Sequence, residues 1–571
     1  MELLKEVNMT KYFAALLILF VAWPSFAADR NGYTAQYECR ASGPHCKVDV
    51  AALTAQSCQQ TITTSDSAAK IDSKLNGAAN VICVQNGDYT SQGTWRLTAS
   101  GTSGQWRILR YTNTVDKNDE PWNQSSSDKA KIAGITVNAN FWIIQRIALS
   151  SFVNVDDNAN NVIFDRILAE NIDGDMVDFH GSSDVTLQNS VVRNTITGGT
   201  SDKHCTVSGG TASNLHLVNN EIYNCQGDGY QVSPGSGVPG LVIENNDIYL
   251  TSAYYTQGGT EACAENALDL KSGGTSTSPV EIIHNRLWGH RYTDSSCADG
   301  SYGEEIIYHE TNGSGQHNSY GLIQNNVIFD GTIAITSPNR EAGGPDHWSI
   351  IGNLMYDFSG VGSGTSVLGL ESTYTEAYLN TFIETAQAAS VGWLSYNKSL
   401  NQDIRCNVSL DGGRTTAYGT GTESQIDHNV YYNTTAAAEP NKIVESIASR
   451  ANSTTYSLNQ IIRTASVKSC VNGTESACFL YKVTQAGTSA GSAPSYCTTL
   501  GCTETDGTVT LRAIRGPYTF YRKLRTGPET YTIPYARAYV STTNSSDSAP
   551  EVNTCPSSYA SRRGIGISDA Q

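Results

Sequence analysis

Short runs of alternating apolar and polar residues fill the middle of the chain, and one phrase within them returns again and again. Between residues 140 and 435, a polar residue, most often asparagine, is followed by an apolar or aromatic pair. The phrase is clearest at Asn189, Asn220, Asn246, Asn285, Asn326, Asn353, Asn380 and Asn429. Repetition at such spacing is typical of a solenoid built from stacked coils.

The periodicity within each coil is that of a β-strand. Apolar side chains occur at every second position, as at Val185 and Leu187, which places them on one face of a strand. A stack of hairpins would need tight Asn-Gly or Asp-Gly turns at every second link, and these are largely missing. We therefore expect an all-β fold, a right-handed parallel β-helix, in which the asparagines stack at a bend and bond along the ladder.

The flanks of the repeat differ from its middle and suggest a division of the chain. Residues 1–27 are expected to be a signal peptide and 28–110 an N-terminal cap with the first coils. Residues 111–437 form the expected catalytic β-helix, and 438–571, where the repeat is lost, a C-terminal cap or small subdomain.

An export signal is predicted at the N-terminus. Lys11 precedes the apolar run 12–23, and small residues before Ala28 suit cleavage there. The run is too short to cross a bilayer, which takes about 20 residues. All 14 cysteines follow it, an even number that favours disulfides in an exported chain. We expect a secreted protein, extracellular or periplasmic, that acts as a monomer away from membranes.

The charge of the chain narrows its partners. It carries 37 basic against 54 acidic residues, a net charge of −17. Such a surface disfavours nucleic acid and anionic membranes. If the substrate is a polyanion, the site must carry a local cation, and a bound metal ion is the obvious device.

Two long coils mark the expected functional face. Their insertions, near 250–264 and 289–303, flank the strand 265–273, and insertions in a solenoid often line its binding face. Leu268 and Leu270 have the parity of core residues. The outward positions then belong to Glu265, Asp269 and Lys271.

Neighbouring coils extend this polar patch. The coil before it contributes Asp228, between two glycines on an expected exposed turn, and Tyr230. The coil after it contributes Glu304, Glu305, Tyr308 and His309. Tyr308 takes the inward parity of Leu270, and His309 the outward parity of Lys271. Two coils upstream of Asp228, Asp178 and His180 repeat the outward pair of acid and base.

The stretches ENALDLKSG and GEEIIYHE resemble the active strand pair of the chondroitinase B and alginate lyase family. The opening coils, from GTSGQWRILRYTN to KIAGITVNANFWIIQRIAL, are similar to that family and to the calcium-dependent β-helix pectate lyases. The resemblance implies a calcium ion held by strand carboxylates and a nearby lysine as base. The family's Arg-His pair is Tyr308-His309 here, and His290-Arg291 in the second insertion is a possible substitute for its arginine.

The expected activity is therefore calcium-assisted β-elimination on an acidic, uronate-containing polysaccharide. Lys271 is the expected base, with His309 and Arg291 as further catalytic residues; an amine base needs a depressed pKa, which the carboxylates oppose unless calcium cancels their charge. The expected calcium ligands are Asp228, Glu265, Asp269, Glu304 and Glu305, and the expected substrate-binding residues are His180, Tyr230, Tyr308 and His290.

Two other functions stay open on the same scaffold. A glycoside hydrolase would use paired carboxylates, such as Asp228 with Asp269 or Glu304, as acid and base without a metal. A non-catalytic glycan-binding protein or adhesin would draw on the tyrosines and tryptophans but leaves the strand of Lys271 unexplained. Unsaturated products separate the lyase from the hydrolase, and a lack of any cleavage favours the adhesin.

Overall fold

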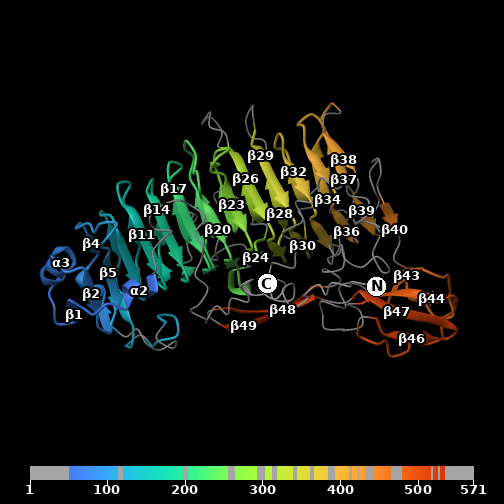
Figure 1. Cartoon of the computed structure of the whole chain (residues 1–571), viewed down its shortest axis with the longest axis horizontal. Helices are drawn as coiled ribbons and strands as arrows, with labels where there is room; N and C mark the ends of the chain where they lie inside the picture. Colours follow the sequence, from blue (N-terminus) through green and yellow to red (C-terminus); the bar gives the residue numbers. More distant parts are fainter. Residues whose placement is uncertain are drawn as a thin grey trace, which may run out of the picture.

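A computed structural model shows a right-handed parallel β-helix with three long sheets, which confirms the fold expected from the sequence. The coils follow one another along the long axis in sequence order, from blue to orange in Figure 1. Each coil between the two ends contributes one strand to sheet A, one to sheet B and one to sheet C, and each of these strands pairs in parallel with its equivalents in the coils before and after.

The structure describes residues 50–533 apart from a series of gaps. These gaps are 113–119, 126, 197–202, 255–263, 292–302, 311–317, 339–343, 360–365, 384–391, 411–414, 422–423, 428, 433–442, 446–447, 465–478, 500, 516–517 and 525–526. The predicted signal peptide and most of both predicted insertions lie outside the described residues.

Sheet A has 14 strands. They are β1 (Gln60–Ile62), β2 (Val81–Val84), β5 (Arg107–Tyr111), β8 (Trp142–Gln145), β11 (Asn160–Asp165), β14 (Ser183–Gln188), β17 (Ser213–Val218), β20 (Val242–Glu244), β23 (Val280–Ile283), β26 (Ser319–Gln324), β29 (Asp346–Ile351), β32 (Glu376–Tyr378), β35 (Asp403–Arg405) and β38 (Gln425–Asp427).

Sheet B also has 14 strands. They are β3 (Gly87–Tyr89), β6 (Ala130–Ile132), β9 (Ala148–Leu149), β12 (Leu168–Ile172), β15 (Val191–Thr195), β18 (Glu221–Tyr223), β21 (Asp247–Tyr249), β24 (Arg286–Trp288), β27 (Val327–Phe329), β30 (Leu354–Tyr356), β33 (Thr381–Ile383), β36 (Val408–Leu410), β39 (Val430–Tyr432) and β40 (Ile443–Glu445).

Sheet C has 12 strands and carries the candidate site. They are β4 (Trp95–Leu97), β7 (Ile135–Val137), β10 (Val153–Val155), β13 (Val177–Asp178), β16 (Thr206–Ser208), β19 (Tyr230–Val232), β22 (Leu268–Leu270), β25 (Glu304–Tyr308), β28 (Ile333–Ser337), β31 (Ser366–Leu370), β34 (Gly392–Asn397) and β37 (Thr415–Tyr418).

An asparagine ladder fixes the bend between sheets A and B, as the repeat predicted. Its members are Asn220, Asn246, Asn285, Asn326, Asn353, Asn380, Asn407 and Asn429. The Asn246 backbone N–H and side-chain amide both donate to Oδ1 of Asn285, at 2.9 and 3.0 Å. Its amide also donates to the Leu217 carbonyl. These bonds satisfy backbone groups that the bend leaves unpaired.

Asn189 departs from the pattern inferred for it. The ladder position in its coil is Ser190, whose backbone N–H donates to Asn220. Asn189 belongs instead to a second ladder, one residue earlier, where it accepts from Asn219 at 2.6 Å. Both ladders have the same cause, because side-chain amides repeat at the spacing of parallel strands.

The core runs along the inside of all three sheets. Trp142, Trp348 and Trp393 are among its largest fully buried side chains. At the N-terminal end, Ile71 and Leu75 of helix α3 (Ala68–Asn76) join the same core. Ser67 caps this helix by accepting from the Lys70 backbone N–H, and the short helix α2 (Val50–Thr54) precedes it. Solenoid ends need such covers because they would otherwise expose core.

The described cysteines are oxidised, as the even count predicted. Disulfides join Cys58 to Cys83, Cys205 to Cys225 and Cys497 to Cys502. Cys406 is also disulfide-bonded, and no cysteine in the described part of the chain is free. The other seven cysteines lie outside the described residues.

A separate five-stranded sheet follows the solenoid. It contains β41 (Ala448–Ser449), β43 (Ile461–Arg463), β44 (Leu480–Gln485), β47 (Val509–Arg515) and β46 (Thr503–Asp506), and it has a core of its own. Two further pairs are β42 (Thr455–Tyr456) with β45 (Gly487–Thr488), and β48 (Tyr518–Leu524) with β49 (Gly527–Ile533). Sheet B reaches Glu445, somewhat beyond the expected boundary at 437. No helix in the described ranges could cross a membrane.

Candidate active site

The candidate site lies on the outer face of sheet C, where β19, β22 and β25 are adjacent. Leu268 pairs with Tyr230 on one side and Ile306 on the other, and all three side chains belong to the core. The parity inferred for Leu268 and Leu270 is therefore confirmed. Asp269 takes the outward position between them, in register with Gln231 and Ile307.

Asp269 holds two cationic side chains at once. Its Oδ2 lies 3.1 Å from Nζ of Lys271, two residues further along the same coil. Its Oδ1 lies 3.0 Å from Nε2 of His309, at the end of the next strand. The side chain of Lys271 is 23% exposed, whereas those of Asp269 and His309 are 6% and 3% exposed. Lys271 is therefore the most accessible member of this cluster.

The contacts of His309 identify its protonation state. Its Nδ1 lies 2.7 Å from the Glu310 carbonyl oxygen, which can only accept a hydrogen bond. Its Nε2 faces the Asp269 carboxylate, which is also an acceptor. Only an imidazolium donates from both ring nitrogens, so His309 fits this position as a cation.

The charges in the cluster shift the pKa values of its members in opposite directions. Burial alone would raise the pKa of Asp269, but the hydrogen bond from His309 and the charge of Lys271 outweigh it and lower that pKa. Burial also disfavours the charged form of Lys271, yet the neighbouring carboxylates, Asp269 foremost, raise its pKa. Lys271 is thus a protonated ammonium group in the resting site.

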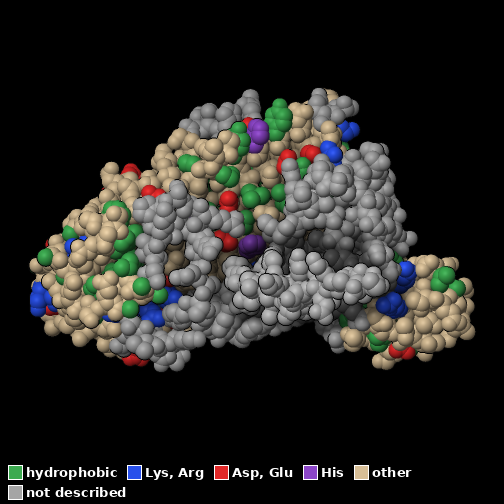
Figure 2. All heavy atoms as spheres, in the orientation of Figure 1, with side chains coloured by type: hydrophobic (Ala, Val, Ile, Leu, Met, Phe, Trp, Pro, Cys, Tyr) green, Lys and Arg blue, Asp and Glu red, His purple; other side chains and the backbone are tan. Residues whose placement is uncertain are grey.

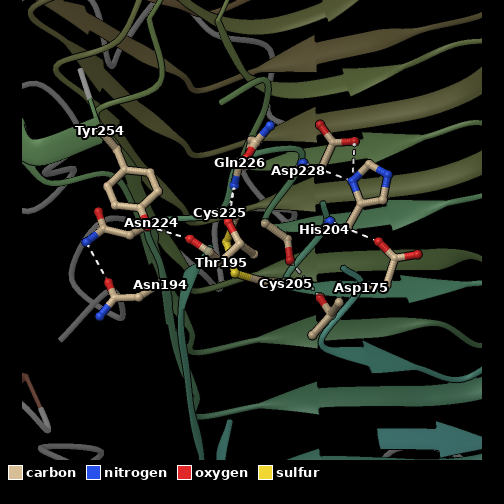
Figure 3. Close-up of a disulfide and its surroundings, with 12 residues drawn as sticks. Asp175, Asn194, Thr195, His204, Cys205, Asn224, Cys225, Gln226, Asp228 and Tyr254 are labelled. Atoms are coloured by element: carbon tan, nitrogen blue, oxygen red, sulfur yellow. Dashed lines mark hydrogen bonds and ion pairs between the residues drawn. A yellow bond between two sulfur atoms is a disulfide. The ribbon is translucent and has the colours of Figure 1, made fainter. Parts of the chain in front are cut away.

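A second row of polar side chains lies where the sheet C strands begin. Its members are Asp175, His204, Asp228, Asn266 and Glu304, one from each successive coil. The side chain of each of the first four accepts from the backbone N–H of the next, at 3.0 to 3.2 Å. Figure 3 shows His204 between Asp175 and Asp228, beside the disulfide of Cys205 and Cys225.

Asp228 is fully buried, which corrects the expectation of an exposed turn. Its Oδ1 accepts two bonds from Asn266, at 2.9 and 3.1 Å, and its Oδ2 accepts one from Gln231 at 3.1 Å. Burial, followed by the charge of Asp269, raises its pKa. The flanking glycines allow this close packing, since a Cβ at Gly227 would lie 2.7 Å from Nδ1 of His204.

Among the described residues, the predicted calcium ligands are not arranged as a calcium site. Calcium takes six to eight oxygen ligands. All four carboxylate oxygens of Asp228 and Asp269 already face donors within the chain. Within the described ranges, no group of three or more His, Cys, Asp or Glu residues is arranged to hold a metal. The residues present therefore do not fit this ion.

Glu305 lies in a different cluster from Asp269. Its Oε1 accepts from the His290 backbone N–H at 3.0 Å, and its Oε2 lies 2.8 Å from His290 Nδ1. Both side chains are almost wholly buried, and burial raises the pKa of Glu305. This arrangement does not support Glu305 as a calcium ligand or His290 as a substrate-binding residue, because the two side chains engage each other inside the protein.

Arg291 extends this second cluster. Its guanidinium lies 2.6 Å from Oδ1 of Asp330, and the two side chains are about one-third exposed. Glu304 and Glu265 lie closer to the candidate site. The Glu304 backbone N–H donates to Asn266, and the charge of Glu265 contributes to the raised pKa of Lys271.

The two tyrosines expected to bind substrate are core residues. Tyr230 is fully buried, with its hydroxyl 2.8 Å from Oγ of Ser208. Tyr308 is fully buried and stacks on Trp348 with ring centroids 4.1 Å apart. Neither can contact a surface glycan, so these two assignments are wrong.

His180 keeps its place on the surface. Its side chain is 43% exposed and lies 3.2 Å from Oδ2 of Asp178. Asp178 occupies the same outward column as Asp269, three coils earlier, through Val207 and Gln231. The repeat of the outward pair seen in the sequence is therefore real, and His180 remains a candidate for binding substrate further along the sheet.

Three residues of the site were missed in the sequence. His204, Gln231 and Asn266 all contact Asp228. The signal that could have found them is strand register, which places them beside the predicted residues. Figure 2 shows acidic and histidine side chains together near the middle of the face drawn.

No known family profile matches the sequence, and no curated protein matches it significantly. Solved structures do resemble it. A mannuronic acid specific family 6 polysaccharide lyase from human gut microbiota is 11% identical, with a TM-score of 0.43 over 68% of this chain and 91% of that one.

Two further similar structures belong to proteins with different roles. A family 6 alginate lyase is 13% identical, with a TM-score of 0.39 over 68% of this chain and 53% of that one. A surface adhesin of Streptococcus pneumoniae is 10% identical, with a TM-score of 0.35 over 81% and 94%. Polysaccharide lyases are thus among the solved structures that this chain resembles. Because the named roles differ, function is inferred from this chain's own residues.

Proposed function

We propose that this chain is a secreted polysaccharide lyase that cleaves a uronate-containing polysaccharide by β-elimination. The observation that carries the proposal is Asp269 holding Lys271 and His309 together on the outer face of sheet C. In a protein with a net charge of −17, these two side chains supply the local cations that an acidic glycan needs.

The reaction assigns a role to each member of the cluster. The proton α to the uronate carboxylate leaves, the bond to the glycosidic oxygen breaks, a carbon–carbon double bond forms and the leaving oxygen gains a proton. Lys271 is suited to accept the first proton once it has lost its own. His309, whose ring nitrogens face the Glu310 carbonyl and Asp269, supplies positive charge beside the site, and the proton that Lys271 has accepted can then pass to the leaving oxygen.

Asp269 orients both partners but opposes the loss of a proton from Lys271. The raised pKa of Lys271 means that only a small fraction is the free amine near neutral pH. The sequence predicts that calcium cancels the charge of the carboxylates, but the oxygens of Asp228 and Asp269 already face donors within the chain.

The test is a product assay with the full chain. Alginate, polygalacturonate and chondroitin sulfate are incubated with the protein, with and without a chelator, and both ultraviolet absorbance and reducing ends are measured. A lyase raises both signals together, because each cleavage forms one unsaturated uronate. Reducing ends without absorbance, or no cleavage of any acidic polymer, would overturn the proposal.

A glycoside hydrolase is the second candidate, and one observation favours it. Burial raises the pKa of Asp228, while His309 and Lys271 lower that of Asp269. Carboxylates whose pKa values are pushed apart can divide the roles of acid and base. Complete burial of Asp228 weighs against direct contact with a glycosidic oxygen, so the lyase is preferred.

A further inference from the structure

One position near the start of the sheet A strands has a left-handed backbone in nearly every coil. With φ between 50° and 74°, it is occupied by Phe141, Asn161, Asp184, Asn214, Gly240, Tyr320, His347, Tyr374 and Asn401. Asparagine, aspartate and glycine tolerate this conformation, whereas bulky residues are rare in it. Aromatic side chains at this position therefore need a reason beyond the backbone.

Three consecutive coils carry aromatic rings here, and these rings form a stack. Tyr320 and His347 have centroids 4.8 Å apart, and His347 and Tyr374 have centroids 5.1 Å apart. The planes differ by 23° and 27°. The next coil carries Asn401, so the stack of rings ends at Tyr374.

Burial does not explain these rings. Tyr374 is 52% exposed, and the side chain of His347 is 43% exposed. Phe141 is different because it packs edge-on, at 5.5 Å, against Trp106, which the strand register places at the same position one coil earlier. A bulky residue with a left-handed backbone is strained, and such residues cluster at ligand sites. An exposed row of such residues points to binding.

The stack begins in the coil of His309, where Asn318, two residues before Tyr320, donates to the His309 carbonyl at 3.3 Å. Tyr320 lies in β26, the sheet A strand that follows β25 and His309 in the same coil. From there the stack continues over two more coils toward the C-terminal end. A polysaccharide held at Lys271 and His309 could extend along the solenoid axis onto these rings.

We propose that Tyr320, His347 and Tyr374 form a glycan-binding platform that holds sugar rings of the polysaccharide away from the cleaved bond. Because the three rings stack on one another, they present their outward edges as one ridge, in which the tyrosine hydroxyls and the imidazole nitrogens can hydrogen-bond to sugars that pack against it. That the bound polymer is the one cleaved at Lys271 rests on the proposed function; binding by the platform does not.

The experiment replaces rings with the residue that the same position uses elsewhere. Tyr374→Asn and the double variant Tyr320→Asn/Tyr374→Asn keep a left-handed backbone that Asn161, Asn214 and Asn401 already adopt. The fold should therefore be retained, and a thermal melt checks this. Leu458→Asn, at a 57% exposed residue beyond the solenoid, is the matched control.

Binding is measured by retardation in native gels that contain alginate, polygalacturonate or chondroitin sulfate. We expect Tyr374→Asn to raise the Kd for a retarding polymer roughly three- to tenfold, the double variant to raise it further, and Leu458→Asn to leave it unchanged. For a cleaved polymer, KM should rise with kcat unchanged.

The outcomes separate this inference from the proposed function. Retardation that is lost in the double variant, without cleavage of any polymer, supports the platform while overturning the lyase. An unchanged Kd in the double variant, or a wild-type protein that no polymer retards, overturns the platform even if Lys271 proves catalytic.

Discussion

Asp269 of strand β22 accepts a hydrogen bond from His309 one coil later, with 3.0 Å between Oδ1 and Nε2. The bond joins two neighbouring coils of the sheet, although the two residues are 40 positions apart in the sequence. It orients the His309 ring and leaves the second carboxylate oxygen to Lys271. The proposed chemistry therefore depends on one carboxylate between two cations.

Replacing Lys271 with arginine tests whether it is the base. Arginine keeps the positive charge but essentially never loses a proton, so polymer binding should largely survive while kcat falls about 10²–10⁴-fold. Lys129→Arg, at a lysine paired with Glu170 at 3.0 Å, is the matched control and should keep its turnover. Near-normal kcat in Lys271→Arg would make the lysine a positioning charge only.

The pH dependence of cleavage distinguishes the two enzyme candidates. The pKa of Lys271 is raised, so the free amine grows as pH rises and the lyase rate should increase toward alkaline pH. A hydrolase with Asp228 as acid should behave oppositely, because its protonated form is lost as pH rises through a raised carboxyl pKa. Initial rates across a pH series decide between them.

Asp269→Asn should shift the pH dependence of the cleavage rate. Removing this carboxylate removes the largest influence that raises the pKa of Lys271, so the alkaline rise should begin at lower pH. The maximal rate should fall as well, since His309 and Lys271 lose their shared partner. A profile that stays in place while the rate falls would mean that Lys271 is not the titrating base.

Chelation tests the role of calcium. Because the oxygens of Asp228 and Asp269 face donors within the chain, we expect cleavage to persist after exhaustive chelation. Elemental analysis of the purified protein is the companion measurement. Activity that vanishes on chelation and returns only with calcium would show that these side chains rearrange around the ion.

Asn353→Ala tests how much the asparagine ladder stabilises the fold. Asn353 donates to Asn380 and to the Ile323 carbonyl and accepts from Asn326, and it is fully buried. Each buried group left unpaired costs about 1–3 kcal/mol, so the thermal unfolding midpoint should drop by several degrees. Asn138→Ala, at an exposed asparagine, should shift it little. Equal unfolding midpoints for the two variants would mean that the ladder adds little stability.

The sequence predicted the scaffold well because each coil repeats the same physical requirements. Alternation placed Leu268 and Leu270 in the core and Asp269 and Lys271 outside, and the asparagines marked one bend. It predicted less of the site, since irregular insertions hide the register between coils. His204 stands beside Asp228, but the spacing along the chain does not reveal it.

Parity alone also failed where a residue's chemistry suggested function. The parity of Tyr308 points inward, although its residue type suggests a contact with substrate. In the structure its ring stacks on Trp348 in the core. Tyr230 pairs with Leu268 and is inward for the same reason. Glu305 was grouped with Asp269 by proximity in sequence, although its partner is His290. Contact partners of polar groups follow from packing, which the pattern does not contain.

The asparagine ladder lets each coil change its length independently of the others. Neighbouring rungs are 22 residues apart at Asn407 and Asn429 but 41 apart at Asn285 and Asn326, with the same bond between them. A coil can therefore grow outward without disturbing its neighbours. New loops over sheet C could be grafted or exchanged between coils, making substrate choice separable from the stability of the scaffold.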